Sequence, residues 1–203
     1  MKLFYSPGAC SLSPHIALRE SGLKFDIERV NLAEKKTEKG TDYTTVNPKG
    51  YVPALLLDNG DLLTEAAVLV QYIADQAQEK KLAPPAGSME RYHFAEWLNF
   101  IATELHKSFG PLFKPDTPEP TKQMFRDRIM TRLGYVDKQL KGKDYLTGNQ
   151  FTVADAYLFT VLRWTDRINL DLGSFPAIVE YRKRVAARPA VNEALKVEGL
   201  LTA

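Results

Sequence analysis

The sequence has a single cysteine, no large excess of charge of either sign and no long apolar run. One cysteine among 203 residues, Cys10, excludes an intrachain disulfide and the cysteine spacing of a zinc finger. With 27 Lys and Arg residues against 25 Asp and Glu residues, the net charge is +2. The chain therefore lacks the basic excess of proteins that bind nucleic acid or anionic membranes. No window approaches the roughly 18 consecutive apolar residues of a membrane span.

Two further absences concern location and cofactors. The apolar run before Pro7 is too short for a signal peptide, so we expect a cytoplasmic protein. No group of His, Cys, Asp and Glu has metal-ligand spacing, and no Gly-rich phosphate-binding loop is present. We therefore expect neither a metal site nor a permanently bound cofactor. The 44% hydrophobic content is typical of a folded globular chain, which at this length has one or two domains.

The sequence before residue 78 predicts short strands that alternate with helices. Strands are expected at residues 2–6, 25–32, 52–57 and 61–63, and helices at residues 11–21 and 65–76. A strand–helix–strand unit implies parallel strands, whereas Asn59-Gly60 between two apolar runs predicts an antiparallel hairpin. The order β-α-β followed by β-β-α therefore predicts a mixed sheet.

Residues 78–88 are polar and rich in proline, as expected of a linker, and beyond them the apolar period is helical. Two stripes recur every three or four residues: Phe94, Leu98, Ile101, Leu105 and Phe109, then Phe125, Ile129, Leu133, Val136 and Leu140. Thr152 and Asp155 can form a capping box for a further, almost wholly apolar helix, which we expect at the centre of a bundle. Pro176 and Pro189 mark two shorter helices.

Cys10 follows the first strand and a Pro-Gly loop, at the start of the first predicted helix. Unpaired N–H groups and the helix dipole favour an anion at such a position, which lowers the pKa of a thiol. The alternative is a small buried side chain, the commoner role of a lone cysteine. The loop-to-helix position favours a functional Cys10.

Val52-Pro53 stands just before a strand that we expect to be internal. Proline cannot donate to a strand ladder, so it belongs at the first residue of the strand. A cis bond there would turn the N–H and C=O groups of Val52 towards a peptide-like ligand. Taken alone, the low frequency of cis bonds favours an ordinary trans proline.

Thr64-Glu65-Ala66 closes the hairpin and opens a helix. The sequence alone favours Thr64 or Glu65 as an N-terminal cap. The functional alternative is an anion site at the N–H of Ala66, with Glu65 binding a ligand ammonium group. That pair of contacts would suit an amino-acid zwitterion.

Asn99, Thr103 and His106 have the spacing i, i+4, i+7, so we expect them to share one face of a helix. This polar face can line a cleft, although a solvated surface is the usual explanation. His106 and Lys107 form a cationic pair that can stabilise a thiolate. By spacing alone, an ordinary surface or core histidine is the commoner case.

Six stretches distributed over the whole chain carry a family resemblance. They are MKLFYSPGACSLSPHI (1–16), VNPKGYVPAL (46–55), LTEA (63–66), WLNFI (97–101), ELHK (104–107) and FTVADAY (151–157). Together they resemble the bacterial beta-class glutathione transferases. Val52-Pro53 and Glu65 with a small neighbour indicate only the wider superfamily, whereas Cys10 together with Glu-Leu-His-Lys indicates the beta class.

The resemblance implies an α+β thioredoxin-like domain over residues 1–80, which binds glutathione. An all-α helical bundle over residues 81–203 would contribute the side that binds the electrophile, and the protein would be a homodimer. Thr152 and Asp155 match the family's capping box, which is a folding element.

Several residues of the first domain acquire expected roles from the resemblance. The proline matching Pro53 is cis in the family, and Val52 binds the cysteinyl part of glutathione through its backbone. Glu65 and Ala66 match the residues that hold the γ-glutamyl end, and Lys35 matches a lysine that reaches the glycine carboxylate. Many relatives have serine at the position of Ala66, so one hydroxyl contact to the γ-glutamyl carboxylate is lost here.

The remaining implied roles concern the sulfur atom and the helical domain. Cys10 and His106 match residues near the glutathione sulfur, with which Cys10 can form a mixed disulfide. Asn99 and Thr103 match further positions that line the glutathione site, some of them facing the partner subunit.

The resemblance implies a detoxifying type of transferase that adds the thiolate of glutathione, its co-substrate, to electrophilic small molecules. One alternative is a glutathione-dependent thiol-disulfide reductase or peroxidase that uses Cys10. Another is a binder of apolar compounds without catalysis. Neither nucleic acid nor membrane is an expected partner. The apolar side chains that are candidate contacts of the electrophile are Phe109, Leu112, Phe113 and Trp164.

Overall fold

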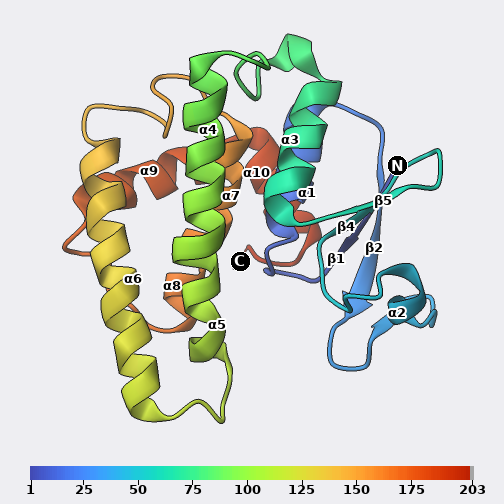
Figure 1. The fold of residues 1–203 in the computed structure, drawn as a ribbon, viewed down its shortest axis with the longest axis horizontal. Coiled ribbons are helices and arrows are strands. Elements are labelled where there is room, and N and C mark those ends of the chain that lie inside the picture. The colour runs from blue at the N-terminus through green and yellow to red at the C-terminus, as the bar shows by residue number, and fades with distance from the viewer. Residues whose placement is uncertain (202–203) are drawn as a thin grey trace. The chain divides into compact units, whose positions relative to one another are not determined.

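The computed structural model describes residues 1–201, which form two compact units (Figure 1). Unit 1 comprises Met1–Ala83 and the C-terminal segment that starts at Ala187, and unit 2 comprises Pro84–Ala186. The first boundary lies close to the expected division after residue 80. The C-terminal segment, expected in the helical domain, groups with unit 1 because helix α10 (Pro189–Val197) packs against helix α1 (Leu12–Ser21).

Unit 1 contains the predicted mixed sheet. Its strands are β1 (Lys2–Tyr5), β2 (Asp26–Asn31), β3 (Lys36–Thr37), β4 (Ala54–Leu56) and β5 (Leu62–Thr64), in the spatial order β3-β2-β1-β4-β5. Strands β1 and β2 are parallel, and all other neighbours are antiparallel. Strand β3 was not predicted, because two residues carry no readable alternation. The sheet and the helices on it give the thioredoxin-like domain that the resemblance implied.

Helices cover the two faces of this sheet. Helices α1 and α3 (Ala66–Gln76) lie beside one face, and the short α2 (Tyr43–Val46) lies beside the other (Figure 1). Side chains alternate along a strand, so the buried Leu3 and Leu55 point to one face and Phe4 to the other. The ring of Phe4 packs on that of Tyr43 at 5.6 Å. Strand β1, which leads into the loop with Cys10, is thereby packed on both of its faces.

Unit 2 is helical, as predicted. Its helices are α4 (Met89–Phe100), α5 (Lys107–Phe113), α6 (Glu119–Leu140), α7 (Val153–Leu162), α8 (Trp164–Arg167) and α9 (Pro176–Ala186), and a π-helical segment (Ile101–His106) joins α4 to α5. Both predicted apolar stripes are buried, except that Phe125 is half-buried.

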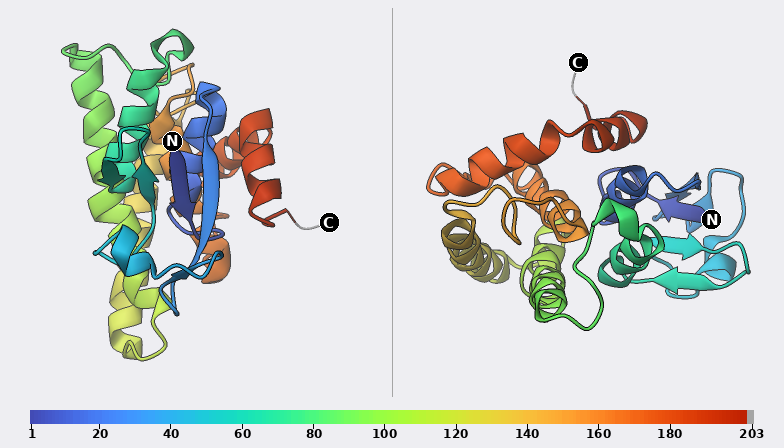
Figure 2. Two further views of the ribbon diagram at one scale, coloured as in Figure 1. Left: turned by 90° about the vertical axis from the view of Figure 1, so that its right-hand side faces the viewer. Right: turned by 90° about the horizontal axis from the view of Figure 1, so that it is seen from above.

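Helix α7 is buried along its whole length and contacts α4, α9 and the π-helical segment, among which it lies in Figure 2. Thr152 and Asp155 form the predicted capping box at its start. The expectation of a central apolar helix is confirmed. In residues 1–201 no helix combines the length and apolar character needed to cross a membrane.

Candidate functional site

Cys10 lies in the turn between β1 and α1, as its position in the sequence predicted. It is partly exposed, and its thiol donates a hydrogen bond to the carbonyl oxygen of Val52 at 3.3 Å. The Val52–Pro53 peptide bond is cis, as the resemblance implied and against the interpretation from the sequence alone. Helix α1 begins two residues after Cys10, at Leu12. The one thiol of the chain is therefore placed on the backbone of the segment that precedes β4.

The two carbonyl groups before that of Val52 are also held by side chains. Nζ of Lys35 donates to the carbonyl oxygen of Gly50 at 2.7 Å. The carbonyl oxygen of Tyr51 accepts from Nδ2 of Asn47 at 2.7 Å and from the hydroxyl of Tyr43 at 3.1 Å. Burial raises the pKa of Tyr43 to about 12, so its hydroxyl remains a donor at neutral pH. Three successive carbonyl groups are thus fixed, which holds the backbone of this segment in one conformation.

Glu65 occupies the N-cap position of α3 without capping the helix through its side chain. Its backbone has φ +70°, and no hydrogen bond runs from its carboxylate to the first N–H groups of α3. Instead Oε1 accepts from Nζ of Lys49 at 2.7 Å and from the hydroxyl of Tyr51 at 2.8 Å. The hydroxyl of Thr64 accepts from the same lysine at 2.9 Å. The capping role that the sequence favoured for Thr64 or Glu65 is therefore wrong.

The chemistry of this carboxylate follows from its surroundings. The pKa of Lys49 and the pKa of Tyr51 are both raised, and the largest cause of each shift is the hydrogen bond to the Glu65 carboxylate. The carboxylate of Glu65 thus has two side-chain donors, the ammonium group of Lys49 and the hydroxyl of Tyr51. Ala66, which opens α3, is buried at 6% exposure. A carboxylate beside a helix N-terminus offers one acceptor for a cation and N–H donors for an anion.

In unit 2, His106 is held by an aromatic cluster. Its Nδ1 lies 2.7 Å from the hydroxyl of Tyr157, and its ring packs edge-on against Trp164 at 4.8 Å. Trp164 in turn packs against Phe109 at 5.6 Å and Phe113 at 5.7 Å. We call these five residues the aromatic cluster. It fixes the plane of the imidazole and presents an apolar surface beside it, at the half-exposed Phe113.

The predicted polar face of Asn99, Thr103 and His106 exists only in part. Asn99 and Thr103 are exposed, and the hydroxyl of Thr103 donates to the carbonyl oxygen of Asn99 at 3.0 Å. His106 instead turns towards the buried Tyr157. The reason is the π-helical segment, whose i→i+5 bonding widens the turn and rotates the residues that follow. The prediction that all three residues share one face of a helix is therefore wrong.

One buried hydrogen-bond network that supports the loop with Cys10 was not predicted from the sequence. The side chains of His15 and Glu198 are both fully buried, with Nδ1 2.8 Å from Oε1. Oε2 of Glu198 accepts from the backbone N–H of Gly8 at 2.9 Å, and Nε of Arg19 donates to Nε2 of His15 at 3.0 Å. Because Nε2 of His15 accepts the hydrogen bond from Arg19, Nδ1 is the ring nitrogen that carries a hydrogen, and it donates a hydrogen bond to Oε1 of Glu198. Glu198 follows α10, and no sequence signal links it to His15.

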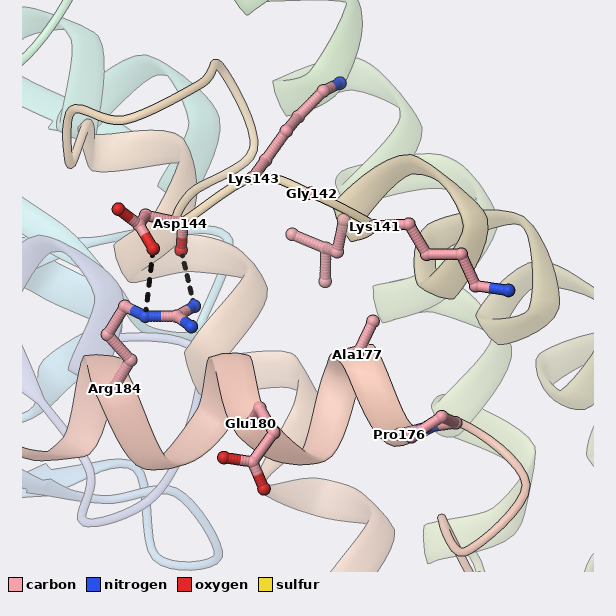
Figure 3. Close-up of a pocket in the computed structure, with 9 residues that line it drawn as sticks. Lys141, Gly142, Lys143, Asp144, Pro176, Ala177, Glu180 and Arg184 are labelled. Carbon is pink, nitrogen blue, oxygen red and sulfur yellow. Dashed lines mark hydrogen bonds and ion pairs between the residues drawn. The ribbon is translucent and has the colours of Figure 1, made fainter.

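A surface hollow of about 460 Å³ lies in unit 2, where α6 ends and α9 begins (Figure 3). Arg184 binds Asp144 there: its Nη1 donates to the carbonyl oxygen of Asp144 at 2.9 Å, and its Nε lies 3.4 Å from Oδ1 of the same residue. Lys141 and Lys143 extend away from it in Figure 3. None of the predicted site residues lines this hollow, so it is separate from the candidate site. Within residues 1–201, no three His, Cys, Asp or Glu side chains gather as metal ligands.

Comparisons with known proteins bear on both units. The model of the glutathione S-transferase N-terminal domain matches residues 8–76, and that of the C-terminal domain matches residues 100–189. The chain is 53% identical to glutathione S-transferase GstA of Escherichia coli O157:H7 over 200 residues, which cover 98% of this chain and 100% of that protein.

Two solved structures are similar over nearly the whole chain. A sphingomonad glutathione S-transferase complexed with glutathione has a TM-score of 0.95 and 49% identity, and a beta-class glutathione S-transferase of Sphingomonas chungbukensis has a TM-score of 0.96 and 48% identity. Each alignment covers 99% of this chain and 100% of the other.

Proposed function

The chain belongs to the glutathione S-transferase family, in its bacterial beta class, and is an enzyme with glutathione as co-substrate; from this premise we propose how its residues bind glutathione. The matches favour conjugation of the glutathione thiolate to electrophiles over disulfide reduction or mere binding of apolar compounds.

The observation that carries the proposal is the hydrogen bond from the Cys10 thiol to the carbonyl oxygen of Val52. The backbone N–H and C=O groups of Val52 are the proposed partners of the cysteinyl part of glutathione. A tripeptide bound there would bring its sulfur close to Cys10. Because the preceding carbonyl groups are held by Lys35, Tyr43 and Asn47, the Val52 segment is fixed before the ligand arrives, which lowers the entropic cost of binding.

The two ends of glutathione have separate proposed partners. Glu65 would accept the ammonium group of the γ-glutamyl end, and the N–H of Ala66 at the start of α3 would donate to its carboxylate. Lys35 is exposed, and its ammonium group donates to the carbonyl oxygen of Gly50; we propose that it also binds the glycine carboxylate of glutathione. Each of the three charged groups at the two ends of glutathione thus has a proposed partner: a carboxylate for its ammonium group, and a backbone N–H and a lysine for its two carboxylates.

We further propose that His106 contacts the glutathione sulfur and stabilises the thiolate, which is the nucleophile of the conjugation. The bond to Tyr157 and the ring of Trp164 fix its orientation. Asn99 and Thr103 are proposed to line the glutathione site as well. The aromatic cluster favours an apolar electrophile, for which Phe113 offers the exposed edge.

The assembly and location are also proposals. We propose a homodimer in the cytoplasm, which detoxifies electrophiles. Each unit exposes large apolar side chains, including Val68 of α3 and Met89 and Tyr92 of α4, which a partner subunit would cover. Light scattering of the purified protein in solution would test the dimer, and a monomer at micromolar concentration would contradict it.

The experiment that tests the function compares the wild-type protein with Cys10→Ala and His106→Ala. Wild type should be retained on immobilised glutathione and conjugate 1-chloro-2,4-dinitrobenzene. Cys10→Ala should still be retained, because Val52 and Glu65 remain, but intact mass after incubation with oxidised glutathione should show no added glutathione. Failure of wild type to bind would refute the glutathione site, and undiminished conjugation by His106→Ala would refute the role of that histidine.

A further inference from the structure

A lysine of this chain lies where the ammonium group of the ligand is proposed to bind. Nζ of Lys49 is 2.7 Å from Oε1 of Glu65 and 2.9 Å from Oγ1 of Thr64. The same carboxylate oxygen accepts from the hydroxyl of Tyr51 at 2.8 Å. A primary ammonium group with two oxygen acceptors is therefore already present at the carboxylate.

The lysine ammonium and the α-ammonium of a γ-glutamyl group have the same chemistry. Each carries one positive charge and three N–H donors, so each can satisfy the same carboxylate oxygen and a neighbouring hydroxyl. We propose that Lys49 is an internal substitute for the ammonium group of glutathione, which the ligand must displace from Glu65. Lys49 would thereby set both the affinity for glutathione and the cost of binding its amino group. This inference rests on the proposed role of Glu65.

The local backbone keeps Lys49 within reach of Glu65. The N–H of Lys49 donates to Oδ1 of Asn47 at 3.1 Å, and the N–H of Gly50 donates to the carbonyl oxygen of Asn47 at 2.8 Å, so the lysine lies in a closed turn. Glu65, with its left-handed backbone, directs its carboxylate to this turn and not to the N–H groups of its own helix. The pairing therefore follows from the backbone on both sides.

The ion pair is also weak enough for a ligand to displace it. The side chains of Lys49 and Glu65 are 47% and 51% exposed, and ion pairs in such surroundings contribute little to stability. The hydrogen bond to Glu65 raises the pKa of Lys49, so the lysine stays charged at neutral pH and competes throughout the working range. Competition of this kind lowers the apparent affinity by a modest factor without preventing binding.

The test measures binding by calorimetry at low ionic strength, where an exposed ion pair is least screened. The ligands are S-methylglutathione, which cannot form a disulfide with Cys10, and its analogue without the α-amino group. The variants are Lys49→Met, which removes the cation, and Lys49→Arg, which retains it. Lys24→Met, at an exposed lysine elsewhere in unit 1, controls for the loss of one positive charge.

Lys49→Met should bind S-methylglutathione about two- to five-fold more tightly than wild type, the factor expected for removal of an exposed ion pair. The analogue without the amino group should gain nothing, because it does not displace the lysine. Lys49→Arg and Lys24→Met should bind as wild type does. An unchanged or weaker affinity of Lys49→Met, or an equal gain for both ligands, would overturn the inference alone. If wild type itself fails to bind S-methylglutathione, the proposed function falls and this inference falls with it.

Discussion

At the scale of single residues, the candidate site illustrates how far residue type predicts a role. Cys10 was identified from its place between a strand and a helix, and its thiol does lie on the Val52 backbone. Glu65 was misjudged, because the sequence does not reveal a residue with φ +70° that turns its carboxylate away from its own helix. The contacts of Lys49 and Tyr51 with Glu65 were not predicted either, because these residues lie 16 and 14 positions from Glu65 in the sequence.

Ala66→Ser tests the proposed contact to the γ-glutamyl carboxylate. The added hydroxyl should supply one hydrogen bond, worth about 0.5–1.5 kcal/mol, and so tighten glutathione binding by up to about ten-fold. Calorimetric titration with glutathione measures the change. Ala67→Ser, which adds the same hydroxyl one residue further along α3, serves as the control. An affinity that Ala66→Ser leaves unaltered would argue against this contact.

At the scale of elements, hydrophobic period and turn signals predicted four of the five strands, the longer helices and the capping box, because those features depend on neighbours in the sequence. The two-residue β3 and the four-residue α2 are too short to carry such a signal. The π-helical segment Ile101–His106 was not predicted, since its residues continue an ordinary apolar stripe and contain neither glycine nor proline. One widened turn was enough to move His106 away from the exposed face of Asn99 and Thr103. The direction of the His106 side chain therefore depends on a local helix geometry that the sequence pattern does not reveal.

Glu198→Gln tests how the segment after α10 supports the loop before α1. The carboxylate accepts from the N–H of Gly8 and pairs with the fully buried His15. A glutamine keeps the shape but loses the charge and one acceptor, so the free energy of unfolding should fall by about 1–3 kcal/mol. Urea unfolding measures this loss. Glu193→Gln is the matched control, because Glu193 is half-exposed and lies 3.8 Å from Arg19; an equal loss in both variants would contradict the prediction.

Asp155, at the start of α7, makes stability depend on pH. Burial outweighs the four hydrogen-bonding groups around its carboxylate and raises its pKa to about 6, above the value of about 3.9 in an unfolded chain. The folded state therefore binds this proton more tightly than the unfolded state. The contribution of Asp155 to stability is full below about pH 4 and is lost as the pH rises through about 6.

The measurement compares wild type with Asp155→Asn, whose side chain does not titrate, by urea unfolding from pH 4.5 to pH 7.5. The free energy of unfolding of wild type relative to the variant should fall as the pH rises to about 6 and then remain constant. Asp116→Asn, at an exposed carboxyl group, controls for the loss of one charge. A relative stability of wild type that rises over this interval would show that the hydrogen bonds, and not burial, dominate.

At the scale of the whole molecule, the resemblance predicted the family and the enzyme class, and the hydrophobic pattern predicted a part with strands and helices followed by a helical part. Neither predicted that the C-terminal segment from Ala187 packs with unit 1. Its helical period is the same whether it packs on the bundle or on α1, because an amphipathic stripe specifies an apolar partner and not which one. Only the packed structure shows that the buried Val191 and Leu195 belong to unit 1.

Leu195→Ala tests this division of the molecule. Truncating a fully packed leucine should cost about 2–5 kcal/mol, and the loss should be felt first by the elements that α10 contacts. Native-state hydrogen exchange should therefore show reduced protection in α1, with α7 less affected. Leu158→Ala, at an equally buried position of α7, is the matched variant and should give the reverse pattern. If Leu195→Ala instead lowered protection in α7 and α9 while α1 stayed protected, α10 would belong energetically to the helical unit, as the sequence alone suggested.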